Sequence, residues 1–259
     1  MKHALHAEWT KQRTLASTPW LLLAAAALTI IVSAAAAAAT RCPSGACADD
    51  PAKVSLTGIY LGQAVVAVLA VMTVSGEYGT GMISLTLTAM PRRLTVLAAK
   101  AAIVTGLTLI TGAIAVLGSL LAGRLILPGH GIGPSHGYPA LSFSDDPVLR
   151  AGLGSVLYLV LIALLSLGAA TMMRDAAAAI GAVLGLLYLF PIIAAAAGNA
   201  TVSRHLEQIG PMTAGLAIQA TTGLGSQPIS PWAGLGVLAA WAASALLLGG
   251  ALLRLRDAN

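Results

Sequence analysis

The sequence predicts an all-α, polytopic membrane protein with six transmembrane helices, and composition and charge distribution are the reasons. Hydrophobic residues make up 58% of the 259 residues, charged residues make up only 9%, and the mean hydropathy is +0.87. Soluble domains carry about 25% charged residues, because their surfaces face water. The charges also avoid six runs, each longer than the roughly 20 residues that a helix needs to cross the hydrocarbon core. These runs are 14–40, 54–76, 101–123, 151–173, 176–203 and 208–253.

Three other interpretations of the apolar runs fit the pattern less well. A soluble alanine-rich bundle needs charged side chains every three or four residues, and the runs contain none. Barrel strands alternate in segments of about ten residues, whereas these runs are continuous and rich in Ala and Leu, which favour helices. The first run follows basic residues, as in a signal peptide, but it is longer than a signal-peptide core and further spans follow it. We expect a retained first helix.

The distribution of basic residues predicts the orientation of the spans. The spans are expected at 18–39, 56–74, 101–121, 151–173, 176–197 and 232–252, in one domain of residues 18–259. With the N-terminus inside, the cytoplasmic segments hold Lys2, Lys11, Arg13, Arg92, Arg93, Lys100, Arg174, Arg254 and Arg256. The outer segments hold Arg41, Lys53, Arg124, Arg150 and Arg204. This bias predicts a multi-pass protein with both termini in the cytoplasm. It also accounts for the net charge of +5, so we expect no nucleic-acid binding.

Residues 1–17 are expected to form a cytoplasmic interface helix. Leu5 and Trp9 share one helical face, and the charged Lys11 lies off that face. Such a helix lies in the plane of the membrane surface among the lipids, and Trp9 anchors it there. The alternative is a frayed N-terminal tail.

The fifth span and the segment after it carry the residues that interrupt regular helices. Pro191 removes one intrahelical hydrogen bond and is expected to kink the fifth span. Gly181 and Gly185 form a G-x-x-x-G motif that permits close helix approach, although the motif is weak evidence in so alanine-rich a chain. The stretch 198–231 mixes apolar residues with Gly, Thr and Pro, and we expect it to re-enter the outer leaflet as short helices.

The outer loops contain the cysteines and two of the histidines. Cys42 and Cys47 both fall in the first outer loop, on the oxidising side of the membrane, where a local disulfide is expected. The alternative is two free thiols. His130 and His136 lie in the glycine- and proline-rich loop 122–150, where such side chains are more often solvated than bound to a metal.

The chain carries no recognisable catalytic machinery. It has no phosphate-binding G-x-x-x-x-G-K-[ST] motif, and His205-Leu206-Glu207 lacks the second histidine of a zinc helix because position 209 is Ile. The expected spans contain almost no ionisable residues, so a proton relay is not expected. We therefore expect no enzyme activity, no metal site and no cofactor in this chain. Energy for any transport would come from another subunit.

Two cytoplasmic segments resemble a known family. The matching residues are Glu8-Trp9-Thr10-Lys11, then Glu77-Tyr78-x-x-Gly81-Met82-Ile83, then Pro91-Arg92-Arg93 with Lys100 after them. Together with the layout of the whole chain, they resemble the membrane subunit of a type-2 ABC exporter, most closely the alanine-rich permeases of actinobacteria. Ala16 and Gly79 depart from that family, where a basic residue and a larger residue are common.

The resemblance implies an ATP-driven exporter in a bacterial plasma membrane. Residues 75–93 would form a coupling loop that sits in a cleft of a separate ATPase subunit, and that subunit would bind ATP and Mg. The interface helix would also touch the ATPase. Six spans are few to enclose a path, so we expect a second permease copy or a similar permease. The path would be lined by spans two and five and carry an apolar or amphipathic substrate.

Two other functions remain open from the sequence. A non-transporting membrane scaffold or assembly protein would equally lack a catalytic site. A secondary transporter or small channel is the third hypothesis, but such transporters have interrupted helices in both halves. Only the fifth span carries a proline late in its run, with no counterpart in the first half.

Overall fold

The computed structural model describes residues 2–41, 50–79, 93–132, 141 and 145–255. Within those residues every regular element is a helix, and six helices are long and apolar enough to cross a membrane. The prediction of an all-α, six-span membrane protein is confirmed. The six are α2 (Ser17–Ala39), α4 (Ile59–Gly79), α6 (Arg93–Ile126, continued by the 3-10 turn η1, Leu127–His130), α7 (Asp146–Met173), α8 (Ala176–Ala196) and α11 (Pro231–Leu255). The shorter elements are α1 (Lys2–Thr14), α3 (Pro51–Ser55), α9 (Ala200–Ile209), α10 (Pro211–Leu216), η3 (Ala217–Gln219) and η4 (Leu224–Ser226).

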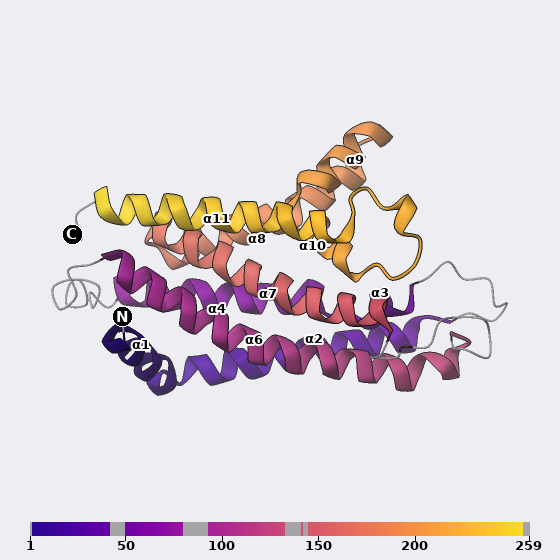
Figure 1. Ribbon diagram of the computed structural model, residues 1–259, viewed down its shortest axis with the longest axis horizontal. Helices are drawn as coiled ribbons and strands as arrows, with labels where there is room; N and C mark the ends of the chain where they lie inside the picture. Colours follow the sequence, from indigo (N-terminus) through magenta and orange to yellow (C-terminus); the bar gives the residue numbers. More distant parts are fainter. Residues whose placement is uncertain (1, 42–49, 80–92, 133–140, 142–144, 256–259) are drawn as a thin grey trace.

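The long helices run side by side along the longest axis of the molecule (Figure 1). The N-terminal α1, the C-terminal end of α11 and the start of α6 lie at one end of the bundle, which we call the terminal end. The opposite, distal end carries α3, α9 and α10 (Figure 1). An even number of spans brings both termini to one end, and the positive-inside bias predicts that this end faces the cytoplasm.

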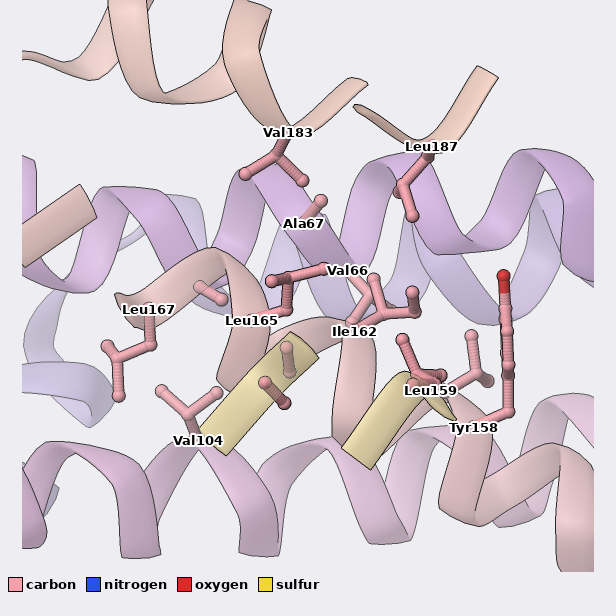
Figure 2. Close-up of a cluster of buried hydrophobic side chains, with 14 of the residues drawn as sticks. Val66, Ala67, Val104, Tyr158, Leu159, Ile162, Leu165, Leu167, Val183 and Leu187 are labelled. Carbon is pink, nitrogen blue, oxygen red and sulfur yellow. The ribbon is translucent and has the colours of Figure 1, made fainter. Parts of the chain in front are cut away.

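Helices α4 and α7 form the centre of the bundle. Buried residues make up 61% of the apolar window of α4 and 67% of that of α7, against 17–33% for the other four spans. Helix α7 packs against α4, α6, α8 and α11. Figure 2 shows Val66 and Ala67 of α4 among the side chains of α7, with Leu187 of α8 on the far side. The other four spans therefore pack around these two helices.

Small residues allow the closest helix crossings. A Cβ atom on Gly168 of α7 would lie 2.5 Å from the backbone carbonyl carbon of Ala245 in α11. By contrast, Gly181 and Gly185 are exposed, and a Cβ on either would meet no atom of another element within 4 Å in the described part of the chain. The G-x-x-x-G motif of the fifth span therefore mediates no helix contact among the described residues. Helix α8 continues through Pro191 to Ala196.

The segment between the fifth and sixth spans folds into short helices, as expected. Helix α10 is almost wholly buried and packs against α8 and α11. Helix α9 has no buried residue and carries an apolar row of Val202, Leu206 and Ile209 at positions i, i+4 and i+7. It extends away from the bundle at the distal end (Figure 1). Of the short helices, α9 is thus the one with the clearest amphipathic pattern.

One carboxylate ties this segment to the first distal loop. Asp50 caps α3 by accepting hydrogen bonds from the backbone N–H groups of Ala52 and Lys53. The same side chain accepts from the backbone N–H groups of Thr221 and Thr222 and from the Thr221 hydroxyl. Asp50 is only 8% exposed, so these five donors replace the water that a buried carboxylate loses.

Candidate functional site

Four charged side chains meet where α1, α4 and α6 converge at the terminal end. Lys100 Nζ lies 2.9 Å from Glu8 Oε2 and 2.5 Å from Glu77 Oε1. Lys11 Nζ lies 2.9 Å from the same Glu77 oxygen and 3.4 Å from Glu8 Oε1. Each cation therefore touches both carboxylates. We call Glu8, Lys11, Glu77 and Lys100 the charge cluster.

The charge cluster is largely buried, and pairing is what makes its burial possible. Glu8, Lys100 and Glu77 are 1%, 4% and 7% exposed. Ionised groups are tolerated away from water only when opposite charges and hydrogen bonds compensate for lost hydration. The cluster contains two cations and two anions, and Lys100 also donates to the backbone carbonyl of Thr73 at 3.1 Å. Its formal net charge is therefore zero.

Lys11 is the member of the cluster that is most open to water. Its side chain is 26% exposed. Burial disfavours the ammonium, but the hydrogen bond to Glu77 and the attraction of Glu8 and Glu77 outweigh that effect and raise the pKa of Lys11 above its ordinary value of 10.5. Lys11 is thus fully charged near neutral pH.

The α1 helix packs against the bundle through a face that the sequence analysis did not identify. Its buried residues are Ala4, Glu8 and Gln12, spaced at i, i+4 and i+8 along one face. The apolar Trp9 is 46% exposed and is not one of these buried residues. The prediction of a helix at 1–17 is confirmed for Lys2–Thr14, but its attachment to the bundle is polar. The role of Trp9 as a lipid anchor stays a prediction.

The third span begins earlier than expected, and this places Lys100 inside it. Helix α6 begins at Arg93 rather than at residue 101. The predicted boundary was set by the end of a charge-free run, and Lys100 interrupts that run without leaving the helix. The expectation that the spans hold almost no ionisable residues is therefore wrong for the terminal ends of α4 and α6. Their charges are paired with each other and with α1.

Other side chains fasten the same end of the bundle. The Arg174 guanidinium lies 5.5 Å from the centre of the Tyr78 ring, a cation–π contact between the α7–α8 junction and the last turn of α4. Arg174 has a φ of 59° and caps α7 in the left-handed conformation. Arg93 donates to the carbonyl of Leu253 at 2.8 Å, which ties the start of α6 to α11. The residues on both sides of segment 80–92 are thus anchored to several helices.

Apart from Trp9 on α1 and Pro191 at the distal pocket, the predicted site residues fall into two groups. Glu8, Lys11, Glu77, Tyr78 and Arg93 lie together at the terminal end. The predicted coupling residues Gly81, Met82, Ile83, Pro91 and Arg92 lie outside the described residues, as do Cys42 and Cys47. The disulfide and the shape of the coupling loop stay predictions.

A pocket opens next to the charge cluster. It has a volume of about 420 Å³ and lies in the elbow between α1 and α2, with α4 as its far wall; we call it the elbow pocket. Its lining comprises Lys11, Gln12, Thr14, Leu15, Ser17, Thr18, Leu21, Met72, Thr73, Gly76 and Glu77. Polar groups and apolar side chains thus meet in one space.

A second pocket, of about 230 Å³, lies at the distal end. Tyr60 of α4 and Pro191 of α8 line it together with Lys53, Glu207 and Gln227, and we call it the distal pocket. Below it Gln63, which is fully buried, donates to the Tyr60 carbonyl at 3.2 Å. The hydroxyl of Tyr158 donates to the Gln63 side chain, so a polar group is held deep between α4 and α7.

The described residues include no group of three or more His, Cys, Asp or Glu side chains placed to hold a metal ion. The comparisons with known proteins add no assignment. No protein-family model matches the chain, and no curated protein matches it.

Proposed function

We propose that this chain is the membrane permease subunit of an ATP-driven exporter of the type-2 ABC class, powered by a separate ATPase subunit. The resemblance of the cytoplasmic motifs supports the class. The observation that carries the proposal is the charge cluster, because it joins the two helices that flank the predicted coupling loop 75–93 to the N-terminal helix.

The cluster would make these three helices respond together. Glu77 lies in the last turn of α4 and Lys100 in the second turn of α6, so a push on the loop between them reaches both ion pairs at once. Breaking a buried ion pair is costly, and the three elements are therefore expected to move as one body. ATP-driven closure of the partner would shift the chain between inward- and outward-open states through this body.

The central position of α4 supports a path lined by spans two and five. Glu77 at one end of α4 belongs to the charge cluster, and Tyr60 at the other end lines the distal pocket with Pro191 of α8. A displacement of α4 would thus alter the charge cluster and the distal pocket together. The exposed face of α8, with Gly181 and Gly185, remains available to a second permease copy. The partly apolar lining of the distal pocket suits an amphipathic substrate.

Co-purification with candidate ATPase subunits tests the proposal. The full chain is expected to retain one of them in mild detergent and to stimulate its ATP hydrolysis in proteoliposomes. Gly81→Trp, in the predicted coupling loop, should abolish retention. The matched variant Gly106→Trp places the same side chain in α6, where a Cβ meets no atom of another described element within 4 Å. This variant should retain the ATPase subunit.

Two outcomes would overturn the proposal. One is a chain that purifies alone although every ATPase candidate is co-expressed, which favours the scaffold hypothesis. The other is a vesicle containing only this chain that moves solute, which favours a secondary transporter or channel.

A further inference from the structure

The distal pocket is bordered by segments that lie far apart in the sequence. Lys53 belongs to α3, Tyr60 to the first turn of α4, Pro191 to α8 and Glu207 to α9, and Gln227 follows η4. A molecule in this pocket would therefore contact the distal parts of both spans that are proposed to line the path.

Hydrogen bonds fix the backbone that carries Lys53 and Glu207. Asp50, at the start of α3, accepts from two threonines in the stretch between η3 and η4. Gln208, the neighbour of Glu207 in α9, donates to the Pro228 carbonyl at 2.7 Å. Helices α3 and α9 are thus both attached to the segment between α10 and α11, so the two charged residues lie on backbone that is already in place.

Lys53 and Glu207 carry opposite charges, and neither has an oppositely charged partner in the described part of the chain. Lys53 Nζ lies 3.5 Å from the neutral Gln227 Oε1, its one hydrogen-bond contact among these residues. The Glu207 carboxylate accepts no hydrogen bond from them, although the backbone carbonyl of Glu207 accepts one from the Thr213 hydroxyl at 2.8 Å. Both side chains are partly exposed, so both are accessible from the pocket. A ligand with one negative and one positive group would pair with both.

The lining of the pocket changes from polar to apolar with depth. Tyr60 is 43% exposed and the two charged residues are partly exposed, whereas Met212 and Leu216 are only 3% and 5% exposed. Charged groups thus border the open end, and buried apolar side chains form the closed end. An apolar group beside Met212 and Leu216 would be removed from water, which favours binding. The molecule that fits carries both charges at one end and an apolar body at the other.

We propose that the distal pocket binds an α-amino acid with an apolar side chain, of the leucine type. Its carboxylate would lie against Lys53 and its ammonium against Glu207, while its side chain would lie against Met212 and Leu216. The volume of about 230 Å³ is below the roughly 300–1,000 Å³ of pockets for drug-sized ligands, so the ligand is small. That this amino acid is the cargo rests on the proposed exporter function, whereas its binding rests on the pocket alone.

Equilibrium binding to the full chain in detergent micelles tests the proposal. Saturable binding of radiolabelled L-leucine is measured by scintillation proximity, and unlabelled molecules that each lack one feature compete for the site. Leucinamide lacks the carboxylate, isocaproate lacks the ammonium and glycine lacks the apolar side chain. Each is expected to compete about tenfold less well than leucine, because each leaves a charged or apolar part of the lining without its partner.

Two variants assign the charges to the two ends of the amino acid. Glu207→Gln should weaken leucine binding about tenfold and should not weaken isocaproate, which has no ammonium to lose a partner. Lys53→Met should weaken leucine to the same degree and should not weaken leucinamide, which has no carboxylate. Asp145→Asn is the control, because that exposed carboxylate makes no capping bond to α7 and lies outside the pocket. It should bind leucine as the wild type does.

Size-exclusion profiles show that each variant is folded, and competition at the wild-type chain needs no variant. Absence of saturable leucine binding, equal competition by leucine, leucinamide and isocaproate, or unchanged leucine affinity in Glu207→Gln would each overturn the proposal. None of these results would affect retention of an ATPase subunit, so the exporter function would stand. Conversely, leucine binding by a chain that retains no ATPase would support the pocket and contradict the exporter.

Discussion

Lys100 and Glu8 are 92 positions apart in the sequence, yet their side chains form an ion pair of 2.9 Å that is almost wholly closed to water. The contact makes the N-terminal helix part of the folded bundle. Because Lys100 also holds Glu77 at 2.5 Å, one ammonium is shared by carboxylates from two other helices. Lys100 is therefore the more buried of the two cations that join these helices.

Lys100→Met tests how much this shared ion pair contributes to stability. The substitution leaves Glu8 and Glu77 buried with Lys11 as the remaining cation of the cluster, and removing one partner of a buried ion pair typically costs about 3–5 kcal/mol. A loss of that size in the free energy of unfolding, measured in mixed micelles, is expected. Arg124→Met, at an exposed position of the same helix, should change it by no more than about 0.5 kcal/mol.

The cluster also predicts a rescue. Adding Glu8→Gln to Lys100→Met removes one of the two carboxylates that then share Lys11 as their single cation, so the double variant should be more stable than Lys100→Met alone. Strict additivity of the two single effects would contradict the shared ion pair.

The raised pKa of Lys11 predicts how docking of α1 depends on pH. A cation whose pKa is higher in the folded state contributes stability that is complete below its unfolded pKa and lost as the pH rises through its folded pKa. Docking should thus be constant from neutral pH to 10.5 and weaken above it. Electron paramagnetic resonance distances between spin labels at Thr10 and Arg254, in a background without native cysteines, report the docking.

Lys11→Met is the control for that experiment. It removes the titrating group, so the transition above pH 10.5 should shrink, and any part that remains belongs to other groups. An identical transition in the wild type and in Lys11→Met would exclude Lys11 as its cause.

The six spans could be predicted because the bilayer imposes a long apolar run on each spanning helix, and such runs are visible locally. The start of α6 could not, because the charge of Lys100 is neutralised by residues from α1 and α4 that no local pattern identifies. Glu8, Lys11 and Glu77 were recognised individually, but their pairing depends on helix packing. The G-x-x-x-G motif of α8 likewise shows that a close approach is permitted and does not name the neighbour.

Asp50→Asn is expected to loosen the distal end. The variant exchanges one acceptor oxygen for an amide that cannot accept from Thr221 and Thr222. Hydrogen bonds to charged groups contribute about 1.5–3 kcal/mol, so a loss in this range and faster hydrogen exchange at residues 221 and 222 are expected. Asp175→Asn is the control, because that exposed side chain makes one capping bond to Ala178 and asparagine caps helices equally well. Equal effects of the two variants would show that Asp50 acts only as a cap.

Gly168→Ala tests whether the crossing of α7 and α11 limits the stability of the centre. A Cβ at this position would lie 2.5 Å from the Ala245 carbonyl carbon and 2.7 Å from the Leu246 nitrogen, and a helix backbone cannot yield as a flexible side chain does. Separating the two helices costs contacts along the most buried span, so a loss of about 1–3 kcal/mol is expected, in the range of overpacked cores. Gly106→Ala gains helix propensity without a clash and should stabilise α6 by up to about 1 kcal/mol. Opposite signs for the same chemical change would assign the effect to the crossing, whereas stabilisation by both variants would mean that α11 shifts freely against α7.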